Sequence, residues 1–261
     1  VAECAPWGTR LWLHYIGEPT LHPDLPRFVA TAAATGRLSV GLSTNGIALT
    51  PPLARALIAA GLERLDLSLD AADRETYRRI RGRDRFDLVE RNLHALLALR
   101  KAQGSHLPRI ALQIVTLPEN REAGARILER WREALSPTDF VKTITPATFA
   151  GQIDLPDGSK PAPSPPEGGA SPGTSHCRWI HAHAVILWDG TMSVCPNDYE
   201  GIHAMGNVGE ATIAALWNGP RFAAFRRLHA TGGITPEMLC HRCPDYVGAE
   251  GGRFRYAGFH P

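Results

Sequence analysis

The sequence predicts an α/β protein in which a parallel sheet with alternating helices precedes a small α+β region. Three observations support this prediction. Short apolar segments alternate with segments of helical spacing up to about residue 145, which is typical of right-handed β-α-β units. A stretch rich in proline, glycine and serine follows. Beyond it lie four of the five cysteines, Cys177, Cys195, Cys240 and Cys243.

The first part of the chain contains predicted strands at 11–16, 37–42, 62–69, 109–116 and 139–145. Helices are predicted between them at 24–35, 51–60, 86–103 and 119–134. Pro51 and Pro52 suit the first turn of a helix, and Gly36 and Gly61 follow two predicted helix ends. Because the strands alternate with helices, we expect the strands to be parallel.

The proline-, glycine- and serine-rich stretch predicts a domain boundary. Residues 155–175 contain almost nothing to bury, so we expect a flexible linker at 151–176. This linker joins a first domain, 1–150, to a second domain, 177–250, which is followed by a tail at 251–261.

The second domain has its own pattern of short elements. A β-hairpin is predicted from 182–187 and 191–194, and short helices at 211–217 and 221–229. The core of so short a region is small, and a bound metal would compensate for it.

The composition excludes several functional classes. The formal charge is +2, with neither a basic block nor an acidic tail, so no nucleic-acid partner is expected. No apolar run approaches the roughly 18 residues that span a membrane, and no signal peptide is visible. Cysteines spaced like ligands favour a reducing cytoplasm. The chain lacks an initiator methionine and enters an element almost at once, so we expect it to be a fragment without its N-terminal segment.

The four clustered cysteines predict a tetrathiolate metal site. Their layout is C-x17-C, then the intervening residues 196–239, then C-x2-C. Iron–sulfur clusters and zinc both accept four thiolates, so the spacing alone leaves both open. Histidines that could also serve as ligands are His176, His181, His183 and His241.

Other residues near the cysteines have an ordinary interpretation beside a functional one. His181 and His183 alternate along a predicted strand, so they share one face. They are most simply polar strand residues, but they could also line a substrate pocket. Asp198 follows the second cysteine, where it could act as a base or orient a substrate, although an ordinary role is favoured. We expect the tryptophans of this region to pack around the metal site and exclude water: Trp179, Trp188 and Trp217.

Polar and glycine-containing motifs follow three of the predicted strands. Ile16-Gly17-Glu18-Pro19 follows the first, Ser43-Thr44-Asn45-Gly46 the second, and Ser68-Leu69-Asp70 ends the third, with Arg81 shortly after. Ligands of parallel sheets bind at these strand ends. Each motif alone is most simply a turn or a cap, but together and in this order they indicate a ligand site.

These motifs resemble those of the radical S-adenosylmethionine (radical SAM) enzymes. The resemblance runs from about residue 11 to 145 and includes GEPTLHPDL, STNG, LDLSLDAADRETYRRIRG and Asn120. It implies a partial (β/α)6 TIM-like barrel that lacks its first strand. Ile16 stands where the family usually has a first glycine.

The resemblance also implies residue roles toward S-adenosylmethionine. Gly17, Glu18 and Pro19 would hold its methionyl amino group, and Thr44 and Asn45 would lie near its ribose. Ser68 and Arg81 would bind its ribose or carboxylate, with Arg79 as a competing candidate for the arginine.

One family motif does not occur in this chain. The catalytic 4Fe–4S cluster of the family is held by C-x3-C-x2-C, which would lie upstream of Val1. Cys4 is a single thiol that cannot replace three ligands, and an inert buried role is expected for it. We therefore expect the chain alone not to cleave the cofactor, and a second 4Fe–4S cluster in the missing N-terminal segment.

The C-terminal region resembles the SPASM and Twitch auxiliary-cluster domains of these enzymes. The matching segments are CRWIHAHAVILWDGTMSVC, GNVGEATIAALWN and CHRC. Beside the upstream match, they favour an auxiliary 4Fe–4S cluster over zinc. Since Cys243 is the last cysteine, one cluster with four ligands is implied, which suits electron transfer or a structural role.

The implied function is a radical SAM oxidoreductase or maturase. A 5′-deoxyadenosyl radical would abstract hydrogen from a peptide or small alcohol, with reducing equivalents from a donor such as flavodoxin or ferredoxin. The alternative is a non-catalytic binding or scaffold protein with a structural zinc or iron–sulfur site.

Overall fold

A computed structural model describes residues 1–154, 177–243 and 246. The chain forms two compact units that divide between Thr145 and Pro146. We call the part up to Thr145 the barrel unit and the described part from Pro146 onward the cysteine unit. Most of the predicted linker and the whole predicted tail lie outside the described residues. Within the residues described, no helix has the length and apolar character needed to cross a membrane.

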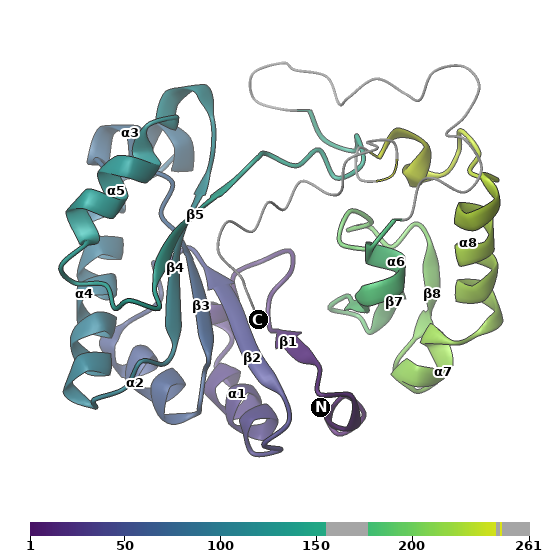
Figure 1. Ribbon diagram of the computed structural model, residues 1–261, viewed down its shortest axis with the longest axis horizontal. Coiled ribbons are helices and arrows are strands. Elements are labelled where there is room, and N and C mark those ends of the chain that lie inside the picture. The colour runs from purple at the N-terminus through teal and green to yellow at the C-terminus, as the bar shows by residue number, and fades with distance from the viewer. Residues whose placement is uncertain (155–176, 244–245, 247–261) are drawn as a thin grey trace. The chain divides into compact units, whose positions relative to one another are not determined.

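The barrel unit is built on a parallel sheet of five strands in sequential order, which confirms the predicted α/β class (Figure 1). The strands are β1 (Arg10–Trp12), β2 (Ser39–Thr44), β3 (Arg64–Ser68), β4 (Arg109–Val115) and β5 (Phe140–Ile144). Strand β1 is shorter than predicted. Neighbouring strands run parallel throughout, so their carboxyl ends share one edge of the sheet.

Helices of the barrel unit gather along one face of the sheet (Figure 1). They are α1 (Leu25–Ala33), α2 (Pro51–Ala59), α3 (Arg74–Arg81), α4 (Phe86–Ala102) and α5 (Ala123–Trp131), with 3₁₀ turns at Ala5–Trp7, Pro19–Leu21 and Pro118–Asn120. Helix α3 was not predicted, because only Tyr77 of its residues is buried. The Asp73 carboxylate caps its first turn by accepting a hydrogen bond from the Thr76 amide, and Gly82 ends it at φ 68°.

The two faces of the sheet differ in character because side chains alternate along each strand. One face is apolar and packs against the helices, with a core that includes Val40, Leu42, Leu65, Leu67, Ile110, Leu112 and Ile114. The other face carries charge. There, Arg64 Nε lies 2.7 Å from Asp66 Oδ1 and Lys142 Nζ 3.1 Å from Asp66 Oδ2, in a buried ion-pair group.

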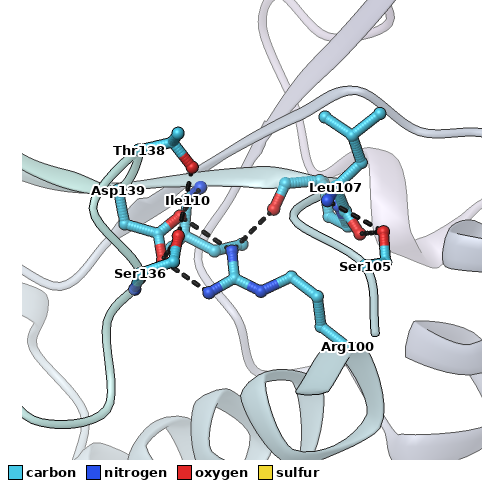
Figure 2. Close-up of polar contacts among 8 residues, drawn as sticks. Arg100, Ser105, Leu107, Ile110, Ser136, Thr138 and Asp139 are labelled. Carbon is cyan, nitrogen blue, oxygen red and sulfur yellow. Dashed lines mark hydrogen bonds and ion pairs between the residues drawn. The ribbon is translucent and has the colours of Figure 1, made fainter. Parts of the chain in front are cut away.

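A buried arginine–aspartate pair joins α4 to the amino ends of β4 and β5 (Figure 2). Arg100 Nη1 and Nη2 donate to the two carboxylate oxygens of Asp139 at 2.7 and 2.5 Å, and the side chain of Asp139 is completely buried. The same carboxylate accepts the amide N–H groups of Ile110 and Ser136, both at 2.7 Å. These four donors together favour the charged carboxylate, which joins α4 to the amino ends of β4 and β5.

The cysteine unit contains a small antiparallel sheet with three described strands, β6 (Val185–Ile186), β7 (Thr191–Ser193) and β8 (Ala204–Asn207). Its helices are α6 (Trp179–Ala182), α7 (Ile213–Trp217), α8 (Pro220–Thr231) and the 3₁₀ turn Leu239–Arg242. Strands β6 and β7 form the predicted hairpin, whose turn requires Gly190 at φ 87°, since a Cβ there would lie 2.7 Å from Asn207 Oδ1. Strand β8 was not predicted.

Two expectations about this unit are wrong. His181 lies inside helix α6 and His183 follows it, so the pair does not alternate along a strand. Trp188 is 97% exposed in the hairpin turn and cannot exclude water from a buried site, whereas Trp179 and Trp217 do pack against the core.

Candidate functional site

The structure brings the four clustered cysteines into one core. Cys177 precedes α6, Cys195 follows β7, and Cys240 and Cys243 lie in and at the end of the last 3₁₀ turn. All four are at most 8% exposed and pack with Met192, Val194 and Phe222 among others. Three separate parts of the cysteine unit therefore contribute to one sulfur-rich site.

The thiols of this site influence one another. Burial raises the pKa of Cys195 to about 12, and the nearby thiols of Cys243 and Cys177 add to the rise. Burial likewise raises the pKa of Cys240, together with the charges of the other three cysteines. Buried thiols of this kind stay protonated at neutral pH, so metal loading must displace their protons.

Hydrogen-bond donors surround two of the sulfur atoms. Asn197 Nδ2 lies 3.5 Å from Cys243 Sγ, and the amides of Asn197 and Asp198 donate to Cys195 and partly oppose the rise of its pKa. Gln152 Nε2 holds this turn by donating to the Asn197 carbonyl at 2.6 Å. Such donors stabilise thiolate ligands and tune the potential of iron–sulfur clusters.

The donor set fits a cluster of iron and sulfide. Among the described residues, no three or more His, Cys, Asp or Glu side chains form a group that could hold a metal ion, so the fit rests on the chemistry and burial of the four cysteines. A buried, all-sulfur set with amide donors directed at sulfur suits the soft ligand preference of iron–sulfur clusters. His176 lies outside the described residues.

Asp198 holds the turn after Cys195. It is fully buried, and its carboxylate accepts hydrogen bonds from Ser193 Oγ at 2.9 Å, the Ile202 amide at 2.8 Å and the His203 amide at 3.0 Å. These contacts give the carboxylate a structural role beside the second cysteine, which is the ordinary role favoured from the sequence.

The second site lies at the carboxyl ends of β1, β2 and β3 in the barrel unit. Gly17 adopts φ 130°, a conformation that only glycine takes readily, and a Cβ there would meet nothing within 4 Å. Glu18 Oε1 accepts from Thr20 Oγ1 at 2.5 Å and Thr44 Oγ1 at 2.6 Å, and Oε2 accepts from the Asn45 amide at 2.8 Å. The carboxylate therefore ties the first turn to the end of β2.

Two residues predicted near a ribose also stabilise this turn. Thr44 is buried, and its hydroxyl accepts the Gly46 amide at 3.0 Å while donating to Glu18. Asn45 Oδ1 accepts the Ile47 amide at 2.9 Å. The structure thus brings Gly17, Glu18, Thr44 and Asn45 together with Pro19, which begins the short 3₁₀ turn, and their roles toward a cofactor stay predictions.

Arg81 reaches the end of β3 from the last turn of α3. Its Nη2 donates to the Ser68 carbonyl at 2.8 Å and pairs with Asp70 Oδ2 at 2.5 Å. Arg79, the competing candidate, is exposed on the same helix. Among described atoms, the buried Nε of Arg81 has no hydrogen-bond partner. Since Leu67 pairs with Thr44 in the sheet, Ser68 ends the strand next to β2, whose end the Glu18 carboxylate contacts through Thr44.

Asp70 was among the residues predicted at the strand ends, but no role was predicted for it. Asp70 follows β3, is 3% exposed and adopts φ 59°, which is uncommon for a residue other than glycine. Asn120 Nδ2 donates to its carbonyl at 2.8 Å. In the sequence it closes the strand-end segment LSLD, which gives its position but not its partners.

Comparison with known families matches both units. Residues 1–130 match the Radical SAM superfamily, and residues 177–244 match SPASM, an iron–sulfur cluster-binding domain. The chain is 44% identical over 99 residues to GTP 3',8-cyclase of Chlorobaculum tepidum, covering 38% of this chain and 30% of that protein. It is 33% identical over 113 residues to a probable GTP 3',8-cyclase of Metallosphaera sedula, covering 43% and 33%. The matches thus span about a third of these relatives.

Solved structures share the fold over most of the chain. BtrN in complex with AdoMet and 2-DOIA has a TM-score of 0.56 at 19% identity, covering 98% of this chain and 81% of that one. Native anSMEcpe with bound AdoMet has a TM-score of 0.56 at 16% identity, covering 93% and 74%. At these identities the likeness concerns the fold.

Proposed function

Because the chain belongs to the radical SAM superfamily and carries a SPASM iron–sulfur domain, we propose that it is part of an enzyme that abstracts hydrogen from a peptide or small alcohol. The strongest support is that one chain contains two sites whose residues the fold brings together. One is the strand-end site around Glu18 and Arg81, and the other is the buried core of four cysteines.

The strand-end site suits S-adenosylmethionine. The cationic Arg81 keeps a buried donor without a partner among described residues, as a carboxylate ligand requires, and the open turn at Gly17 leaves room for an amino group. The chemistry that this cofactor supplies, on reductive cleavage at a 4Fe–4S cluster, is a 5′-deoxyadenosyl radical that abstracts a substrate hydrogen. The Glu18 carboxylate holds the turn through Thr20, Thr44 and Asn45, so the binding surface is formed before the cofactor arrives.

The four cysteines suit an auxiliary 4Fe–4S cluster for electron transfer. Four ligands complete the coordination of one cluster and leave no iron open to a substrate. Burial of all four keeps water away, and the amide donors near Cys195 stabilise its thiolate. An electron taken from the substrate radical would make the reaction a two-electron oxidation.

We also propose a substrate class and an electron donor. The one-cluster layout favours a small alcohol over a peptide. The curated relatives are named GTP 3',8-cyclases, but they match less than half of this chain. We infer a flavodoxin or ferredoxin as electron donor and a reducing, cytoplasmic environment, because both sites depend on reduced sulfur or reduced iron.

A deuterium-transfer experiment tests this function. The complete protein that contains this chain would be reduced with S-adenosylmethionine and offered a carbon-deuterated aminocyclitol, a carbon-deuterated peptide or deuterated GTP. We expect deuterium from the aminocyclitol in the 5′-deoxyadenosine, measured by mass spectrometry. Transfer from GTP instead would replace the substrate class, and no transfer from any of them, with no 5′-deoxyadenosine formed, would favour the scaffold protein.

A further inference from the structure

We propose that Asp70 is a positioning residue, which holds the Arg81 guanidinium in place to bind the carboxylate of S-adenosylmethionine. The inference rests on the proposed function, since it concerns the same strand-end site. It adds a residue to which the motif comparison gave no role.

The carboxylate of Asp70 connects two elements of the barrel unit. Its Oδ1 accepts the Val115 amide at the end of β4 at 2.7 Å, and its Oδ2 pairs with Arg81 Nη2 at the end of α3 at 2.5 Å. The side chain is 4% exposed, so water competes little with either contact. Burial raises the pKa of Asp70, while Arg81 and the Val115 amide oppose the rise. The orientation of Arg81 is therefore set by a group anchored to the sheet.

The backbone of Asp70 is held in an unusual conformation. Its φ of 59° is disfavoured for side chains with a Cβ. Asn120 maintains it, because Nδ2 of Asn120 donates both to the Asp70 carbonyl at 2.8 Å and to the Val115 carbonyl at 2.9 Å. Strained residues persist where the surroundings determine them, and they cluster at ligand sites. Here the strain directs the carboxylate toward α3.

Arg81 keeps donors for a ligand after these contacts are made. Its contacts to Asp70 Oδ2 and to the Ser68 carbonyl both use Nη2. The buried Nε has no partner among described atoms, and the side chain is 28% exposed. A guanidinium has five donors in a rigid fork, so a second carboxylate can bind another edge. Without Asp70, the Ser68 carbonyl alone would hold the fork, among the contacts described here.

Removing the Asp70 charge has two opposite effects on the affinity of Arg81 for an anionic ligand, so the sign of the measured change distinguishes them. Loss of the negative charge alone would strengthen the attraction of Arg81 for an anionic ligand. Loss of positioning would weaken it. Asparagine is the suitable replacement, because it tolerates positive φ and its amide oxygen can still accept the Val115 amide.

The test measures the affinity of the complete protein for two ligands, S-adenosylmethionine and 5′-methylthioadenosine, which lacks the amino acid. We expect Asp70→Asn to weaken the binding of S-adenosylmethionine about tenfold and to leave that of 5′-methylthioadenosine unchanged. Arg81→Gln should produce a loss of similar size, and the double variant no further loss, since the two residues act as one unit.

Asp73→Ala is the matched control. It removes the capping carboxylate of α3, which accepts the Thr76 amide at 2.9 Å, and lowers thermal stability without touching Arg81. We expect its ratio of affinities for the two ligands to equal that of the wild type. If Asp70→Asn binds S-adenosylmethionine more tightly or as well as the wild type, or if it binds both ligands more weakly to the same extent, Asp70 is not a positioning residue. These outcomes would leave the proposed function intact. A wild-type protein that binds neither ligand would overturn the proposed function as well.

Discussion

Replacing Asp139 with asparagine is expected to lower the free energy of unfolding of the barrel unit by about 3–5 kcal/mol, because it leaves the Arg100 charge buried without its partner. The lost contacts are the two hydrogen bonds from Arg100 to the carboxylate, at 2.7 and 2.5 Å. Urea unfolding followed by circular dichroism measures the effect. The control is Asp84→Asn, which removes an exposed pair with Arg74 at 2.7 Å and should change stability far less.

The same variant should change the pH dependence of stability. Burial would raise the pKa of Asp139, but the hydrogen bonds from Arg100, Ile110 and Ser136 outweigh it, and the pKa is lowered on folding. A carboxyl group with a lowered folded pKa stabilises the fold above its unfolded pKa, about 3.9, and this stabilisation is lost as the pH falls through the folded value. We expect wild-type stability to fall more steeply than that of Asp139→Asn below about pH 4. Parallel pH profiles would contradict this.

Replacing Cys240 with serine is expected to abolish the bound cluster of the cysteine unit. Anaerobically reconstituted wild-type chain should contain about four iron atoms, and a cluster that loses one of four thiolate ligands is not retained through desalting. The serine variant should also lose protection from hydrogen exchange around its buried core, because metal binding contributes to folding there.

Cys4→Ser is the matched control for this prediction. Cys4 lies in the barrel unit, only partly buried, where it packs against the main core. Its replacement should leave the iron content unchanged. Equal iron loss in both variants, or none in Cys240→Ser, would show that the four clustered cysteines do not form the site.

The sequence predicted the elements that periodicity defines. Each predicted strand of the barrel unit is present, because apolar alternation and glycine-terminated helices are local signals. Helix α3 was not predicted because the segment RETYRRIR has no apolar stripe. The cap at Asp73 and the turn at Gly82 define its two ends. In the cysteine unit, the four-residue helix around His181 is too short for its pattern to be distinguished from a strand.

The candidate site was predictable in so far as it lies at strand ends. The motifs around Glu18 and Thr44 follow predicted strands, and the parallel sheet brings them together. The role of Asp70 could not be inferred, because its partner Val115 is 45 residues away and its φ of 59° is a property of the folded backbone. The exposure of Trp188 could not be predicted either, because it depends on the orientation of the hairpin turn in the folded unit.

Reductive cleavage of S-adenosylmethionine would show whether the complete protein forms the radical. The complete protein, extended upstream to include the expected C-x3-C-x2-C motif, would be loaded with iron and sulfide, reduced and analysed for 5′-deoxyadenosine and methionine. The same assay on residues 1–261 alone is the control. We expect both products in equal amounts from the complete protein and neither from the shorter chain. A complete, fully loaded protein that binds S-adenosylmethionine and yields neither product would contradict the claim that this chain belongs to a radical-forming enzyme.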